Sequence, residues 1–213
     1  MHTQRLIAYA FAACLVSLSA GSAMADNERG NPNALLKGTY RHSTIFHCAT
    51  TPQGFTDDLV PLGGGNAGGS TNYTGVITYD GNGHATMSNH GVAIFPGPYP
   101  PEVTSIAAIT FDNNCDWTYR VNPDGSFTQG GDCIGFDRIG PRAFDIPGEQ
   151  IRISNIQLEG QIGVGGQVLI WNQVEPTVQT LEIINRPFSF SNKSICAYHG
   201  TAVRIRGKHQ DQE

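Results

Sequence analysis

The sequence has little charge, no helical periodicity and few long apolar runs. Only 15% of its 213 residues are charged, against the usual quarter, and 26 residues are glycine. Coiled coils and helical bundles are excluded, because they need helix-forming and charged residues with few glycines. The apolar residues come in short β-branched runs, which disfavours intrinsic disorder. No window repeats its apolar residues every 3.6 positions, so we expect very little helix.

Familiar functional motifs are also missing. The formal net charge is −5 and there is no Lys/Arg stripe, so a nucleic-acid partner is disfavoured. No two cysteines have the C-x-x-C spacing of a zinc site or redox dithiol, and no G-x-S-x-G, H-E-x-x-H or EF-hand pattern occurs. Residues 63–68 match G-x-G-x-x-G by letter, but no helix is expected after them. We therefore expect no cofactor and no metal.

The first 25 residues have the pattern of a secretory signal peptide. Arg5 supplies the positive charge, residues 6–18 are apolar, and residues 23–25 (Ala-Met-Ala) form a small-residue cleavage site. A lipid anchor through Cys14 is less favoured, because the residues before it do not match a lipoprotein signal. No later apolar run approaches the ~18 residues of a spanning helix. We expect a secreted or periplasmic chain without a membrane span.

The remaining chain is predicted to be one antiparallel β domain. It covers residues 36–206, between a flexible arm at 26–35 and a disordered tail at 207–213, and no linker divides it. Short β-type runs alternate with turn residues throughout. The expected strands are 37–48, 73–79, 84–92, 104–111, 115–121, 126–134, 151–159, 166–174, 177–185 and 189–206.

Turns and loops separate these strands. Residues 80–83 (Asp-Gly-Asn-Gly) and 112–114 (Asp-Asn-Asn) have typical turn composition. Two longer loops are expected at 50–72, which includes the glycine-rich run 63–69, and at 95–102. Loops of more than about 12–15 residues are usually functional or disordered.

Turn chemistry predicts how the cysteines pair. Four cysteines follow the signal peptide, and in an exported protein they favour two disulfides. Residues 122–125 (Asn-Pro-Asp-Gly) are typical of a three-residue hairpin loop that pairs Asn122 with Ser126. In that register Cys115 lies directly opposite Cys133.

The second disulfide then joins Cys48 to Cys196, on the first and last predicted strands. Pairing of these strands closes an antiparallel meander into a barrel and removes its exposed edges. On the chain-entropy model this bond contributes about 4–5 kcal/mol at most. We predict an all-β fold, a closed barrel of about eight strands with an extra hairpin or strand. A two-sheet sandwich is the alternative.

Two segments of this meander, 36–40 (Leu-Lys-Gly-Thr-Tyr) and 75–83 (Gly-Val-Ile-Thr-Tyr-Asp-Gly-Asn-Gly), resemble calycin-type secreted barrels, meaning the lipocalin and allene oxide cyclase-like group. The likeness is one of strand rhythm over most of residues 36–206. Tyr40 stands where lipocalins prefer tryptophan. The resemblance implies a barrel that holds an apolar small molecule, or rearranges or cyclises it.

The first candidate site is a pair of carboxylates. The hairpin register that pairs the cysteines also places Asp116 opposite Asp132, and opposed like charges destabilise a strand pair. We interpret them as part of a solvated face, screened by Arg120 and water. The alternative is a lumenal pair in which one carboxyl keeps its proton and acts as a general acid.

The second candidate site lies where the first and last strands pair. The register brings His199 near His47 and Arg41, and apolar neighbours such as Val203 predict that this face is the inside of the barrel. Two histidines beside an arginine could serve as acid and base. The alternative is that these groups satisfy one another or lie at a wet barrel mouth. The histidines expected on the surface are His42, His84 and His90.

These inferences predict an exported barrel that takes an apolar small molecule into its lumen. A cofactor-free lyase or isomerase is nearly as well supported, with acid–base catalysis on an epoxide or terpenoid-like substrate. That substrate class comes from fold-level analogy alone. The alternative is a non-catalytic structural or adhesive surface protein that uses its Gly- and Pro-rich loops. The sequence does not indicate an oligomeric state.

Overall fold

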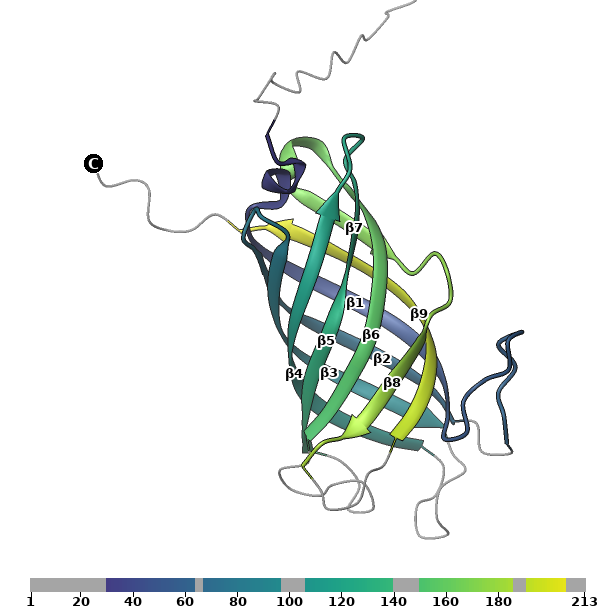
Figure 1. Ribbon diagram of the computed structural model, residues 1–213. Coiled ribbons are helices and arrows are strands. Elements are labelled where there is room, and N and C mark those ends of the chain that lie inside the picture. The colour runs from purple at the N-terminus through teal and green to yellow at the C-terminus, as the bar shows by residue number, and fades with distance from the viewer. Residues whose placement is uncertain (1–29, 64–66, 97–105, 140–149, 186–190, 206–213) are drawn as a thin grey trace, which may run out of the picture. The chain divides into compact units, whose positions relative to one another are not determined.

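The computed structural model describes residues 30–63, 67–96, 106–139, 150–185 and 191–205 (Figure 1). The predicted signal peptide and C-terminal tail lie outside the described residues. The last residues of the predicted arm form a short helix, η1 (Pro32–Leu36), which begins at the cap residue Asn31.

Nine strands and two 3-10 helices occur in this described part of the chain. The second helix is η2 (Val164–Gly166). The strands are β1 (Gly38–Thr51), β2 (Ala67–Tyr79), β3 (His84–Pro96), β4 (Ile106–Val121), β5 (Ser126–Ile139), β6 (Gln150–Ile162), β7 (Val168–Asn172), β8 (Val178–Ile183) and β9 (Ser191–Arg204).

The strands form one closed antiparallel barrel with eight strand positions. Strands β1 to β6 pair in chain order, and β9 closes the ring by pairing with β1. Strands β7 and β8 share one position, because both pair with β6 on one side and β9 on the other. The predicted barrel of eight strands with one extra strand is therefore confirmed, and the chain does not form the alternative sandwich.

Both predicted disulfides are present. Cys48–Cys196 joins β1 to β9 and is called the seam disulfide below, and Cys115–Cys133 joins β4 to β5 and is called the hairpin disulfide. Each joins residues that are direct partners in the strand ladder, as the sequence predicted. Gly125 has a φ of 81°, the left-handed conformation that the predicted β4–β5 turn needs.

The predicted turn at 112–114 is wrong, because these residues continue β4. The expected strands 104–111 and 115–121 are therefore one long strand. Asn113 pairs with Asn89 of β3 along the ladder, and the side chain of Asn89 donates through Nδ2 to Asn113 Oδ1 at 2.5 Å. A side chain that usually favours turns is thus satisfied inside the barrel, and the strand does not have to end there.

The first of the two predicted long loops is shorter than expected. Strand β1 continues to Thr51 and β2 begins at Ala67, so only the middle of the predicted loop 50–72 lies outside strands. Its residues 64–66 lie outside the described part of the chain. The first two residues of the predicted loop 95–102 belong to β3, and the rest is not described.

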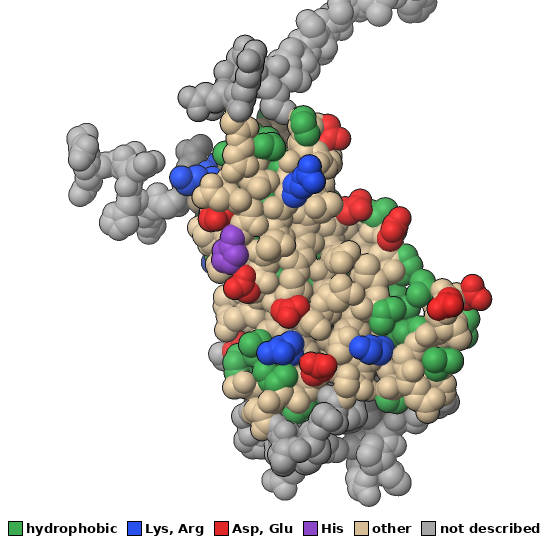
Figure 2. Space-filling view, in the orientation of Figure 1, with side chains coloured by type: hydrophobic (Ala, Val, Ile, Leu, Met, Phe, Trp, Pro, Cys, Tyr) green, Lys and Arg blue, Asp and Glu red, His purple; other side chains and the backbone are tan. Residues whose placement is uncertain are grey.

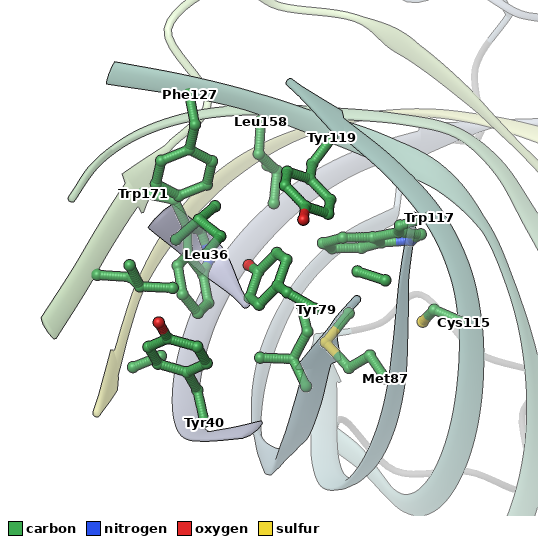
Figure 3. Packing of buried hydrophobic residues seen from close by; sticks show 14 of the residues in the cluster. Leu36, Tyr40, Tyr79, Met87, Cys115, Trp117, Tyr119, Phe127, Leu158 and Trp171 are labelled. Atoms are coloured by element: carbon green, nitrogen blue, oxygen red, sulfur yellow. The ribbon is translucent and has the colours of Figure 1, made fainter. Parts of the chain in front are cut away.

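The barrel is packed solid toward one end. Side chains alternate between lumen and outer surface along each strand, as the pleat requires. Large inward side chains fill the lumen beside η1 (Figure 3). The members of this cluster that are at most 2% exposed and larger than valine are Leu36, Tyr40, Ile77, Tyr79, Trp117, Phe127, Leu158, Leu169 and Trp171.

Helix η1 closes this end. Asn33 accepts two hydrogen bonds from β4, one at its backbone oxygen from Tyr119 Oη (3.2 Å) and one at Oδ1 from the Val121 amide (2.8 Å). Leu36 is fully buried below them. Space for a ligand therefore lies toward the end of the lumen opposite η1.

The outer surface is mainly polar. Figure 2 shows acidic and basic side chains scattered over a face that is otherwise largely neutral and polar, with smaller hydrophobic groups. The outward positions of β4, for example, are Asp112, Asn114, Asp116, Thr118 and Arg120. Among the described residues, no helix has the length and hydropathy needed to cross a membrane.

Candidate ligand-binding site in the barrel lumen

A cavity of about 120 Å³ lies in the lumen at the end opposite η1. Its walls come from eight strands, all except β7, and are mostly aliphatic and aromatic, with no charged side chain among the described lining residues. The apolar lining side chains are Phe46, Ala93, Ile109, Phe111, Ile151, Ile153, Leu181 and Tyr198, together with the seam disulfide. Ligand pockets in proteins have this character, an apolar wall with few polar groups.

A row of aromatic rings in contact runs from the cavity wall into the lumen. Phe46 stacks on Tyr198 with ring centroids 4.7 Å apart, and it meets the Tyr73 ring at 5.6 Å and a steep angle. Tyr73 in turn packs edge-on against His42. Burial raises the phenol pKa of both Tyr73 and Tyr198, so both stay protonated, and Tyr198 donates a hydrogen bond to Gln179.

One amide stands out among the polar lining residues. Gln179 of β8 is 1% exposed, and its Oε1 accepts a hydrogen bond from Tyr198 Oη at 3.0 Å. Its Nε2 has no hydrogen-bond partner among the described residues. By contrast, Thr50 and Ser194 at the cavity satisfy each other with a 2.7 Å bond.

A buried polar chain runs from the middle of the lumen to the cavity. His42 Nε2 lies 2.7 Å from Asn89 Oδ1. Asn89 in turn donates a hydrogen bond to Asn113, which lines the cavity. Because the Asn89 oxygen must accept, His42 carries its proton on Nε2. Burial lowers the pKa of His42 to about 4, against a smaller opposing effect of the Asn89 hydrogen bond. The imidazole is therefore neutral at neutral pH.

The prediction that His42 lies on the surface is wrong, since it is 2% exposed. The predictions for the other two histidines hold. His84 and His90 are exposed and lie 2.6 Å and 2.8 Å from the carboxylates of Asp116 and Asp112.

The face predicted to be the inside of the β1–β9 pair is the outside. Arg41, His47 and His199 are exposed, and Val203 on the same face is 55% exposed. The register is as predicted, with Arg41 opposite Val203, but the side chains of opposite parity point inward. His199 Nδ1 bonds instead to Asn172 on the outer surface, at 2.6 Å. The acid–base role of these residues stays a prediction, and their position gives them no contact with the lumenal cavity.

The predicted carboxylate pair is also on the outer surface. Asp116 and Asp132 are direct ladder partners and both are exposed, with 78% of the Asp116 side chain accessible. This agrees with the solvated face and not with a lumenal acid. A cleft of about 630 Å³ on this outer face is lined by Asp132 and Arg120, under the segment 173–177 that separates β7 from β8. A catalytic role of the pair stays a prediction.

Sequence analysis missed the cavity residues Gln179 and Asn113. A usable signal was the strand face on which the disulfide cysteines lie, since residues at alternate positions of a strand share one face. Cys48 shares its strand face with Tyr40 and Phe46, and the aromatic side chains of that parity mark the interior. The predicted inside instead followed Val203 and Ala197 of β9, which are exposed.

Comparisons with known proteins add the following. No family model matches the chain, and no characterised protein matches it by sequence. The crystal structure of Neisserial surface protein A (NspA) superposes with a TM-score of 0.49 at 11% identity, covering 79% of this chain and 98% of that one. The Salmonella SPI-1 type III secretion injectisome secretin InvG (residues 176-end, open gate state) gives a TM-score of 0.24 at 14% identity, covering 82% and 60%. At these values neither likeness carries an argument about function.

Proposed function

We propose that this protein is an exported barrel that binds an apolar small molecule in the lumenal cavity opposite η1. The observation that carries the proposal is the cavity itself, an apolar space of about 120 Å³ in a barrel whose other end is packed solid. An engineered apolar cavity of ~150 Å³ holds one benzene molecule, so the natural ligand or the part of it that enters is about the size of one ring.

The surroundings support an extracytoplasmic site of action. Two disulfides are typical of an oxidising compartment such as the periplasm or the extracellular space. Barrels that span an outer membrane carry an apolar band outside and polar side chains inside. Most outward side chains of the described strands are polar, with exposed apolar side chains on β1, β3, β7 and β9, and the interior is rich in aromatic rings, which supports work in an aqueous compartment.

Binding of toluene to the purified mature chain, residues 26–213, tests the proposal. Titration calorimetry is expected to show one site per chain. At ten times the dissociation constant, the ligand stabilises the fold by about 1.4 kcal/mol. That corresponds to a rise in Tm of about 3–5 °C for a domain of this size.

A cavity-filling variant provides the control. Ala93 is 3% exposed and lines the cavity, so Ala93→Phe is expected to abolish toluene binding. Ala197→Phe makes the same change at an exposed position of β9 and is expected to leave binding intact. Absence of binding in the unaltered protein, or equal binding in the folded Ala93→Phe variant, would favour the structural or adhesive alternative.

A further inference from the structure

We propose that Gln179 determines ligand class: the cavity takes a neutral, apolar molecule that presents one acceptor oxygen, as in a ketone, ether or epoxide, to the Gln179 side-chain amide. This inference rests on the proposed function and adds the polar contact that selects among apolar molecules of similar shape.

The hydrogen-bond pattern around Gln179 leaves a donor free. Tyr198 Oη donates to the amide oxygen at 3.0 Å, which leaves the amide nitrogen as the other polar end of Gln179. Nε2 has no partner among the described residues, although the side chain is 99% buried, being only 1% exposed. An unsatisfied buried amide costs about 1–3 kcal/mol, and native proteins rarely tolerate it. Because Gln179 lines the cavity, an oxygen of the bound molecule is the partner that this donor lacks.

The other lining groups define the rest of the ligand. No charged side chain lines the described part of the cavity, so an anion or cation would lose its hydration without compensation. The other amide at the cavity, Asn113, already accepts from Asn89. Thr50 and Ser194 are bonded to each other. One acceptor on an otherwise apolar and uncharged molecule is therefore the best match.

A second Tyr–Gln pair in the lumen supplies a matched control. Tyr79 Oη donates to Gln129 Oε1 at 2.6 Å, and Gln129 Nε2 likewise has no partner among the described residues. Gln129 is 4% exposed but does not line this cavity. The same substitution at Gln129 removes an equivalent buried amide without touching the proposed ligand contact.

The test compares cyclohexanone with methylenecyclohexane, which differ by exchange of C=O for C=CH₂ and are close in shape. Dissociation constants of both are measured by calorimetry for the full mature chain and for Gln179→Leu. The ratio of the two constants cancels the difference in hydration when the proteins are compared. Gln179→Leu is expected to lose about ten-fold of the preference for the ketone, the usual contribution of one buried hydrogen bond.

Two further measurements keep the result interpretable. Gln179→Met preserves side-chain length if the leucine variant does not fold, and it is expected to lose the same preference. Gln129→Leu is expected to keep it. The carbonyl stretching band of bound cyclohexanone should lie at lower frequency in the unaltered protein than in the Gln179 variants, because a hydrogen bond weakens the C=O bond.

The outcomes separate the two proposals. An unchanged ratio and an unshifted carbonyl band in the Gln179 variants, with both molecules still bound, would overturn the role of Gln179 and leave lumenal binding intact. That result would also be expected if Gln179 held only a water molecule. Failure of both molecules and of toluene to bind would overturn the proposed function itself.

Discussion

Protonation of His42 is expected to destabilise the barrel between pH 7 and pH 5. The imidazole is 2% exposed, and burial lowers its pKa to about 4 from an ordinary value of 6.5. A group whose pKa is lower in the folded state binds a proton more readily in the unfolded state. The contribution of the neutral His42 imidazole to the free energy of unfolding is therefore complete above pH 6.5. It is lost as the pH falls from 6.5 toward 4.

The size of the effect follows from these two values. Between pH 7 and pH 5 the linkage relation gives a loss of about 2 kcal/mol in the free energy of unfolding. For a domain of this size this lowers Tm by about 4–8 °C. Asp80 and Asp124 also have pKa values below the ordinary 3.8, held there by hydrogen bonds to backbone amides and a hydroxyl. Their contributions are lost only at more acidic pH, outside the window from 7 to 5.

Chemical denaturation at pH 7, 6 and 5 measures this loss directly. His42→Gln retains a donor for the oxygen of Asn89 and cannot titrate, so its stability should be nearly independent of pH in this window. His47→Gln, on the exposed face of the same strand, should behave like the unaltered protein. A full loss of about 2 kcal/mol in His42→Gln would refute the reasoning, because the titrating group would then lie elsewhere.

Three other changes test the packing and the surface. On the chain-entropy model, replacing both cysteines of the seam disulfide with alanine should lower the free energy of unfolding by about 5 kcal/mol. The same change at the hairpin disulfide should lower it by about 3 kcal/mol, because the two loops span 148 and 18 residues. Urea unfolding of the two variants measures the difference. Gly200→Ala should lower stability by about 1–3 kcal/mol or more, because the added methyl would overlap the Trp171 indole, whereas Gly68→Ala meets nothing within 4 Å; equal Tm values would contradict this. Asp132→Asn removes one of two opposed charges beside Asp116 and should raise stability by less than about 0.5 kcal/mol at low salt, an effect that thermal unfolding should find absent at high salt.

Local chemistry was sufficient to predict most of the fold. The turn at 122–125 set the β4–β5 register, and this register with the cysteine count gave both disulfides and the closure of the barrel. The interruption between β7 and β8 matches the gap between the expected strands 166–174 and 177–185, but nothing local indicated that both strands occupy one position. That arrangement depends on pairing with β6 and β9, which are distant in sequence.

The site was harder to predict, because both faces of β1 mix polar and apolar side chains. His42 and Thr44 point inward among aromatic rings, whereas Ile45 is 44% exposed. Hydrophobicity therefore did not identify the inside. No sequence motif marks Gln179 as a cavity residue. Its proposed ligand contact depends on Tyr198 of the neighbouring strand and on a cavity that exists only once the barrel is closed.

Closure of the barrel between its first and last strands also constrains how the chain folds. Strand β2 follows β1 directly in the chain, but the other edge of β1 stays unpaired until the distant strand β9 reaches it. Contacts between such distant segments give a high contact order and slow folding, on the scale of milliseconds to seconds. During that time the free edge of β1 is open to pairing with other chains. Closure of the barrel therefore depends on the presence of β9, and truncation within β9 is expected to favour aggregation over a smaller stable domain.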